Sequence, residues 1–123
     1  MQIFLLSIFG LLGTLSRYAL QGWVQDRTGA TFPTGTLVVN LLGCFLIGGL
    51  NRLALEHLWF PPEWRLALTI GFLGAFTTFS AFGYETFRLL EDGEWASASV
   101  YVGGTLIGGL VAVIGGIKLA ELI

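Results

Sequence analysis

The sequence is poor in charge and in cysteine, and both shortages narrow the possible functions. Of its 123 residues 11% are charged, the formal net charge is -2, and no run of basic residues occurs. No nucleic-acid partner is therefore expected, because such a partner is bound through clustered Lys and Arg. The single cysteine, Cys44, lies in an apolar stretch. It cannot form a disulfide within the chain or supply a metal cluster, so we interpret it as a small buried residue.

Apolar residues and glycine are abundant instead. The chain is 54% hydrophobic and contains 18 glycines, which is too apolar for a soluble domain of this length. Each crossing of a bilayer takes roughly 20 mostly apolar residues, so four crossings use almost the whole chain. We expect an all-α integral membrane protein, embedded in lipid, that forms one transmembrane domain over residues 1–123. The expected spans are residues 2–24, 34–53, 66–89 and 95–119.

The middle of the third expected span is poorly suited to a plain helix. It contains Gly71, Gly74 and Gly83, and the adjacent pair Thr77 and Thr78. Each glycine lowers helix propensity by up to ~1 kcal/mol relative to alanine, and Thr hydroxyls can bond backbone carbonyls and bend a helix. We expect a break between residues 74 and 78. Backbone freed at membrane depth is tolerated only inside protein or beside a cavity or ion site, which makes the break a functional candidate.

Aromatic and hydroxyl side chains alternate across this break. Phe76, Phe79 and Phe82 are three residues apart, and hydroxyl residues such as Ser80 lie between them. The edge of a phenyl ring carries positive partial charge, so ring edges and O–H donors together could line a path for a small anion. The spacing alone favours a simpler interpretation, in which the rings form a packing stripe that faces lipid.

Two other spans carry polar residues at helical spacing. Thr36, Asn40 and Cys44 recur every four residues in the second span, and Tyr101 and Thr105 do so in the fourth. The amide of an embedded asparagine must be satisfied, and its NH2 group offers two donors that an anion could accept. The alternative is a hydrogen bond between helices worth about 1 kcal/mol. The residues alone slightly favour this structural role for Asn40.

Three charged residues are expected near helix ends. Arg17 follows the first apolar run, and a basic side chain near a helix end can extend toward water while its stem stays in lipid. Glu85 and Arg88 are three residues apart near the end of the third span, which predicts an ordinary ion pair at a helix end.

Three stretches resemble the signatures of the Fluc (CrcB) fluoride channels. They are Gly74 to Phe82 (GAFTTFSAF), Gly10 to Tyr18 (GLLGTLSRY) and Gly35 to Gly43 (GTLVVNLLG). The resemblance implies a passive fluoride channel in the bacterial cytoplasmic (inner) membrane, built as an antiparallel homodimer with two permeation paths. Phe79 and Phe82 then match the paired pore phenylalanines, and Asn40 lies beside them.

The same resemblance implies roles for further residues. A structural sodium ion at the dimer centre would be held by the backbone carbonyls of Gly74 and Thr77 from each subunit. Arg17 would lie near the aqueous mouth, where a cation concentrates anions, and Glu85 is a possible vestibule residue. The family also has a hydroxyl track in its last helix, from which this chain departs at Gly109. The residues assigned to the ion path are Arg17, Thr36, Asn40, Phe79, Ser80, Phe82, Tyr101 and Thr105.

The basic residues predict no preferred orientation in the membrane. Three should lie on the side of the termini and three on the other side, namely Arg52, Arg65 and Lys118 against Arg17, Arg27 and Arg88. Because the Lys and Arg bias sets orientation, an even count allows insertion both ways round. Two oppositely inserted copies could then pair about a two-fold axis.

Three other classes of protein compete with a channel. A small four-helix proton-coupled exporter needs a titratable carboxylate deep in a span, whereas every acidic residue here is expected in a connection or near a helix end. An accessory membrane subunit would leave the polar face around Asn40 and the broken third helix unexplained. An enzyme is not expected, because no nucleophile, base and orienting group come together at membrane depth.

Overall fold

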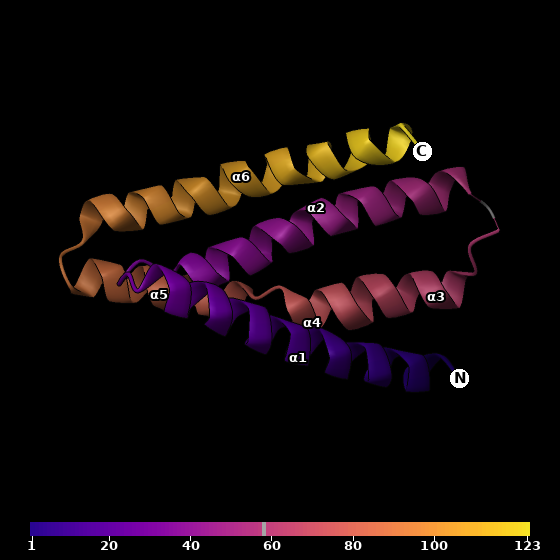
Figure 1. Cartoon of the computed structure of the whole chain (residues 1–123), viewed down its shortest axis with the longest axis horizontal. Coiled ribbons are helices and arrows are strands. Elements are labelled where there is room, and N and C mark those ends of the chain that lie inside the picture. The colour runs from indigo at the N-terminus through magenta and orange to yellow at the C-terminus, as the bar shows by residue number, and fades with distance from the viewer. Residues whose placement is uncertain (58) are drawn as a thin grey trace.

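The computed structural model describes residues 1–57 and 59–123, and the regular structure within them is helical. Figure 1 shows the elements in order along the chain. They are α1 (Gln2–Thr28), α2 (Thr34–Glu56), α3 (Pro62–Leu66), η1 (Ala67–Leu73), α4 (Gly74–Phe76), α5 (Phe79–Glu91) and α6 (Trp95–Glu121). Within the described residues, four helical stretches are long and apolar enough to cross a membrane. These are Gln2–Thr28, Thr34–Glu56, Pro62–Glu91 and Trp95–Glu121, and each contains one of the four expected spans.

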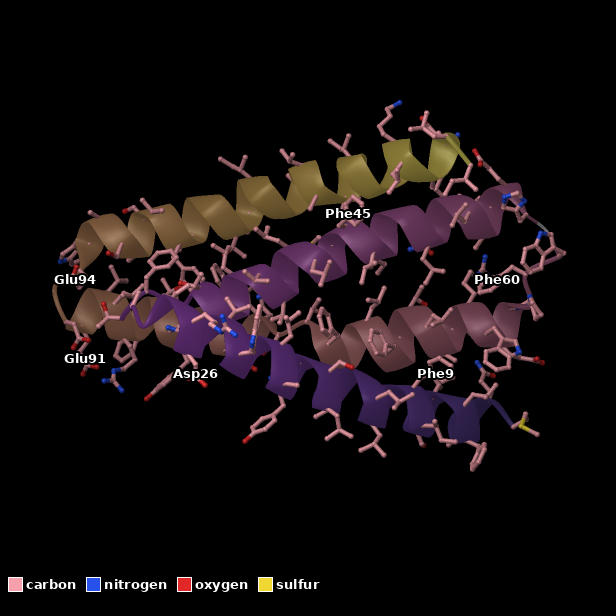
Figure 2. All side chains as sticks on the ribbon, in the orientation of Figure 1. Phe9, Asp26, Phe45, Phe60, Glu91 and Glu94 are labelled. Carbon is pink, nitrogen blue, oxygen red and sulfur yellow. The ribbon has the colours of Figure 1, made fainter. Side chains whose placement is uncertain are left out.

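The helices run up and down, so that both termini lie at the same end of the molecule (Figure 1). The connection between α1 and α2 and the connection between α5 and α6 lie at the opposite end. The labelled side chains of Glu91 and Glu94 lie at this second end, whereas Phe60 lies near the termini (Figure 2). Charged connections and apolar helices therefore separate along the long axis of the molecule, as a bilayer requires.

The first connection is held by one glutamine of α1. Gln25 Nε2 donates to the carbonyls of Ala30 and Phe32, at 2.8 and 3.0 Å, while its Oε1 accepts the N–H of Gly35 at 3.0 Å. Gly29 ends α1 in the left-handed conformation, with φ 57°, which is open to glycine because it has no Cβ. Gln25 thus satisfies an otherwise free N–H at the start of α2.

Helices α2 and α6 pack backbone to backbone through glycines. A Cβ added at Gly116 would overlap the carbonyl oxygen of Phe45, and one at Gly48 would overlap that of Val113. Small residues at spacing four, namely Gly104, Gly108, Ala112 and Gly116, predict that another helix can approach α6 closely. This prediction is only partly correct, because no described atom lies within 4 Å of a Cβ added at Gly104. Because these two helices pack closely, α6 lies beside α2. The hydroxyl residues of α6 then lie near the third apolar stretch, Pro62–Glu91.

Candidate functional site

The third stretch is interrupted at Thr77 and Thr78, inside the range that the sequence predicts. Both residues are extended, with φ -91° and ψ 158° at Thr77 and φ -148° and ψ 114° at Thr78. Before the break, η1 is a π-helix, in which each N–H reaches back five residues, a form frequent at functional sites. An extended pair within a helical stretch frees several backbone groups, and these groups need new partners.

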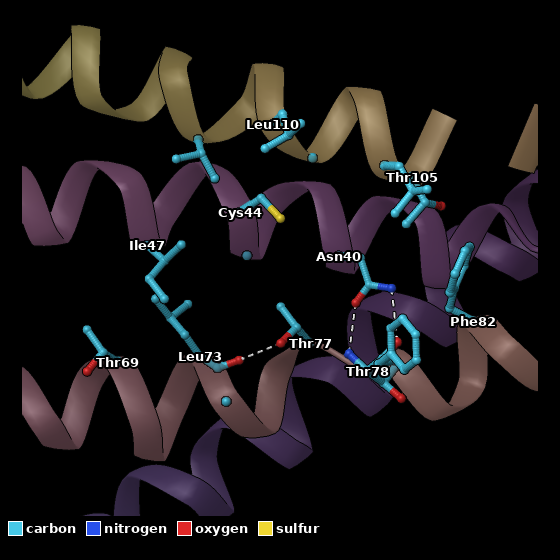
Figure 3. Close-up of a pocket in the computed structure, with 16 residues that line it drawn as sticks. Asn40, Cys44, Ile47, Thr69, Leu73, Thr77, Thr78, Phe82, Thr105 and Leu110 are labelled. Carbon is cyan, nitrogen blue, oxygen red and sulfur yellow. Dashed lines mark hydrogen bonds between the residues drawn. The ribbon is translucent and has the colours of Figure 1, made fainter. Parts of the chain in front are cut away.

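Asn40 supplies two of these partners. Its Oδ1 accepts the N–H of Thr78 at 2.8 Å, and its Nδ2 donates to the carbonyl of Thr78 at 3.1 Å, as Figure 3 shows. The asparagine is 9% exposed, so these bonds are sheltered. Its amide therefore joins α2 to the break, which is the structural role considered for it, and one of its two N–H donors remains without a bond in the described structure.

The Thr pair satisfies further groups around the break. Thr77 Oγ1 donates to the carbonyl of Leu73 at 3.0 Å (Figure 3). Thr78 Oγ1 accepts the N–H of Ala81 at 3.2 Å and so caps the start of α5, which is the usual function of a Thr before a helix. Ser80 is exposed and lies 3.3 Å from Thr78, oxygen to oxygen. The break is therefore an ordered feature and not a local loss of structure.

A pocket of about 730 Å³ lies between α2, α6 and the broken stretch (Figure 3). The rings of Phe79 and Phe82 are 5.7 Å apart between centroids and tilted by 49°. Phe79 is 81% exposed and Phe82 only 8%, so one of the two predicted pore rings lies on the surface and the other is buried. Six of the predicted site residues line this pocket, namely Asn40, Gly74, Thr77, Phe79, Phe82 and Thr105.

Two more predicted residues meet at Glu85, outside that pocket. Thr36 Oγ1 donates to Glu85 Oε1, and the hydroxyl of Tyr101 donates to Glu85 Oε2, each at 2.7 Å. Thr36 is 2% exposed and Tyr101 is fully buried. The ring of Phe82 lies 5.1 Å from that of Tyr101. Phe82 therefore connects the pocket to the carboxylate and its two hydroxyls.

The predicted ion pair between Glu85 and Arg88 is wrong. Arg88 Nε instead lies 3.7 Å from Glu91, and Arg88 Nη1 lies 3.5 Å from the hydroxyl of Tyr84. Helix α5 continues to Glu91, so Glu85 is well inside it and points toward α2 and α6. The expectation that acidic residues occur only in connections or near helix ends must be corrected in the same way.

Glu85 also reaches a second pocket, of about 280 Å³, beside the connections at the end away from the termini. Residues from both connections line it, among them Thr31, Asp92 and Glu94. Glu85 thus has Thr36 and Tyr101 on one side and a pocket near the charged end of the molecule on the other. Phe82, Tyr101 and Glu85 form a connected series from the larger pocket toward this end.

Gln21 also contacts the cluster of Thr36, Tyr101 and Glu85, but it is not among the residues predicted from the sequence. Its Nε2 donates to Thr36 Oγ1 at 3.1 Å, so the single hydroxyl hydrogen of Thr36 is left to point at Glu85. Gln21 Oε1 is buried and has no hydrogen-bond partner among the described residues. A usable signal was present, because Arg17, Gln21 and Gln25 recur every four residues on an otherwise apolar helix and share one face.

Arg17 lies in the middle third of α1 and not near its end. The guanidinium is half-buried, and its Nε donates to the carbonyl of Ala75 at 3.1 Å. It should therefore be omitted from the count of basic residues that flank the spans. The basic residues that flank the spans then number three on the side of the termini and two, Arg27 and Arg88, on the other side.

A cation could be held here by backbone oxygens. Within residues 1–57 and 59–123, no group of three or more His, Cys, Asp and Glu side chains is placed to bind a metal. Gly74 and Thr77 line the larger pocket, and no hydrogen bond from the described residues reaches the carbonyl oxygen of either. Carbonyl oxygens are hard ligands suited to small cations, so these two residues fit the predicted sodium site chemically.

Comparisons with known proteins agree with these observations. The family described as "CrcB-like protein, Camphor Resistance (CrcB)" matches residues 4–117. A protein of Geotalea daltonii named fluoride-specific ion channel FluC is 55% identical over 100 residues, which cover 81% of each chain. One of the same name from Nitrosococcus oceani is 48% identical over 118 residues, or 96% of this chain and 94% of that protein. Another from Acidobacterium capsulatum is 42% identical over 113 residues, covering 92% and 90%.

Proposed function

Because the chain belongs to the CrcB-like protein family, we propose that it is a passive fluoride channel that lowers cytoplasmic fluoride. Its apolar helical stretches make it a multi-pass membrane protein, and the bacterial inner membrane is the proposed location. The observation that carries the proposal is the position of Phe82, whose ring joins the pocket beside Asn40 to the buried hydroxyls around Glu85. Side chains that can contact an anion thus follow one another across several helices.

Fluoride is small and strongly hydrated, so a path must replace its water by several weak donors in series. The free N–H of Asn40, the edge of Phe82 and the hydroxyls of Thr105 and Tyr101 are such donors. The hydroxyl oxygen of Thr105 is buried without a partner among the described residues, and its proton is therefore available. Chloride is larger, so each contact would be weaker and the rings would be crowded.

Permeation past Glu85 requires the carboxylate to share its hydroxyl donors. Thr36 and Tyr101 now donate to Glu85, and an arriving anion competes for the same protons. The like charge of the carboxylate would limit how long an anion stays. An anion that is held by weak or shared donors leaves its site quickly, as conduction requires.

The proposed assembly is an antiparallel homodimer with the break near the middle of the bilayer. Thr77 and Thr78 divide the stretch Pro62–Glu91 into parts of similar length. Phe79 is 81% exposed beside a pocket with a mainly apolar lining, and a second copy placed on this face would cover it. The near balance of flanking basic residues supports two orientations.

A structural sodium ion at the dimer centre completes the proposal. Gly74 is exposed and Thr77 is half-buried, so a partner subunit could reach both residues. A bound sodium ion would neutralise the partial negative charge at the end of each α4. The ligands would be the Gly74 and Thr77 carbonyls of both copies, and the ion would not be transported.

Proteoliposomes loaded with potassium fluoride test the proposed function. Fluoride should leave when valinomycin carries the balancing potassium, and it should stay when no counter-current is possible. Release without valinomycin would indicate proton-coupled export, and equal release of chloride would contradict fluoride selectivity. No release under either condition would favour an accessory subunit.

A further inference from the structure

Arg17 is the only charged side chain among the first 25 residues, and it lies in the middle third of α1. An arginine so placed in a membrane-spanning helix is costly unless specific groups compensate it. Among residues 1–57 and 59–123 it has one hydrogen-bond partner, the carbonyl of Ala75, to which Arg17 Nε donates at 3.1 Å. That partner belongs to α4, two residues before the break.

The Ala75 carbonyl needs this partner because of the break. In a continuous helix it would accept the N–H of Phe79, but Thr77 and Thr78 are extended, and Phe79 instead begins α5. The end of a helix also carries partial negative charge from its unpaired carbonyls. A guanidinium is suited to such a position, since it is a permanent cation with several donors.

Close packing of α1 brings Arg17 within reach. A Cβ at Gly13 would overlap the carbonyl oxygen of Phe72, so α1 and η1 touch there backbone to backbone. Arg17 is one helical turn beyond Gly13 and on the same face. Ala75 is likewise one turn beyond Phe72, which places it opposite the guanidinium.

From this geometry we infer that Arg17 is a positioning residue that ends α4. By binding the Ala75 carbonyl on one side of the break, it complements Asn40, which binds the backbone of Thr78 on the other. Together they leave the carbonyls of Gly74 and Thr77 for the cation. The binding of a cation by these two carbonyls rests on the proposed function, whereas the positioning of the break by Arg17 does not.

Amide hydrogen exchange of the detergent-purified protein tests the positioning. In Arg17→Met, the amides of residues 77–81 should exchange about tenfold faster or more, as expected when a charge-assisted hydrogen bond is lost from an ordered segment. Arg17→Lys keeps a cationic donor and should recover part of this protection. Arg27→Met is the matched control, because Arg27 lies over the Trp23 ring on the same helix and should leave residues 77–81 unchanged.

Sodium titration of the thermal unfolding midpoint tests the link to the cation. Arg17→Met should need a higher sodium concentration than wild type for the same stabilisation, because the carbonyls are no longer held in place. Unchanged exchange at residues 77–81 would overturn the positioning role and leave a purely electrostatic one. Equal or tighter sodium binding by Arg17→Met would overturn the link to the cation. A wild-type protein that does not respond to sodium would refute the proposed cation, while the exchange result would still decide the role of Arg17.

Discussion

Asn40 combines two tasks that the sequence presents as alternatives. Its Oδ1 and one N–H hold the backbone of Thr78, and in the proposed path the second N–H would donate to an anion. A substitution at this residue will therefore change the break as well as the path. The structure predicts that loss of transport and loss of stability occur together here.

Asn40→Asp should show both effects. A carboxylate oxygen in place of Nδ2 would face the Thr78 carbonyl, so two acceptors meet and the fold loses about 1–3 kcal/mol of stability. Fluoride efflux should fall about tenfold or more, since 1.4 kcal/mol of repulsion already gives that factor. Asn51→Asp is the control, because Asn51 is exposed on the same helix, and its one bond among the described residues is to Ile47 of that helix. Wild-type efflux from Asn40→Asp would remove Asn40 from the path.

Tyr101→Phe tests the hydroxyl pair around Glu85. The substitution keeps the ring but removes the donor to Glu85 Oε2, in a site where Tyr101 is fully buried. We expect a loss of about 1–3 kcal/mol in stability together with slower fluoride efflux. Tyr18→Phe, at a residue that is 82% exposed, should change neither the thermal unfolding midpoint nor the efflux rate. If Tyr101→Phe lowers only the midpoint, its hydroxyl has a structural role alone.

Sequence spacing predicted some of these residues better than others. Thr36, Asn40 and Tyr101 were identified because polar residues at helical spacing on apolar helices are conspicuous. The contact of Glu85 with Tyr101 could not be predicted, because it depends on how α5 packs against α6. Gln21 shares one polar face of α1 with Arg17 and Gln25, but its contact with Thr36 depends on how α1 packs against α2.

At the scale of elements, the break was predictable and its exact form was not. Glycine and threonine weaken the helix, but the extended pair at Thr77 and Thr78 is set by the distant side chain of Asn40. Residues 67–73 also contain a threonine and a glycine, Thr69 and Gly71, but these residue types do not predict that η1 is a π-helix. The small residues of the fourth span predict a close helix contact without naming the partner helix, and the structure shows that α2 is this partner and that Gly48 and Gly116 make the close approach.

Gly116→Ala should separate α2 from α6. The new methyl group would overlap the Phe45 carbonyl, and overpacking of this kind typically costs about 1–3 kcal/mol. We expect a lower thermal unfolding midpoint in detergent and a smaller dimer fraction on gel filtration. Gly22→Ala adds the same methyl group where no atom lies within 4 Å and should not lower the midpoint. An unchanged midpoint in Gly116→Ala would contradict the close packing.

At the scale of the whole molecule, the fold follows from the apolar runs of the sequence. The proposed assembly depends instead on a small difference in the number of basic residues that flank the spans. The position of Arg17 inside α1 leaves three flanking basic residues on one side and two on the other. A difference of one charge does not set a strong orientation. We therefore expect both orientations in the membrane, with two opposite copies paired across the exposed face around Phe79.

A single cysteine in a surface connection tests this assembly. On a Cys44→Ala background, Ala30→Cys introduces a neutral, exposed thiol in the connection between α1 and α2. A membrane-impermeant thiol reagent added to intact cells should label about half of the copies, because opposite insertions expose the thiol on opposite sides. Disruption of the membrane should make all copies reactive, which controls for thiols that are merely buried. Labelling of all copies or of none before disruption would contradict dual insertion.

Added charge should then shift the balance in a known direction. Asp92→Lys and Glu94→Lys place two positive charges in the connection between α5 and α6, at the same end of the molecule as the connection between α1 and α2 (Figure 1). Combined with Arg65→Gln and Lys118→Gln on the side of the termini, they leave four flanking basic residues at this end against one at the other. This bias is large enough for this end to be retained in the cytoplasm. External labelling of Ala30→Cys should fall well below half, and fluoride efflux should fall with it, because two copies in the same orientation cannot form the antiparallel pair. Full efflux from a uniformly oriented population would show that the antiparallel dimer is not required.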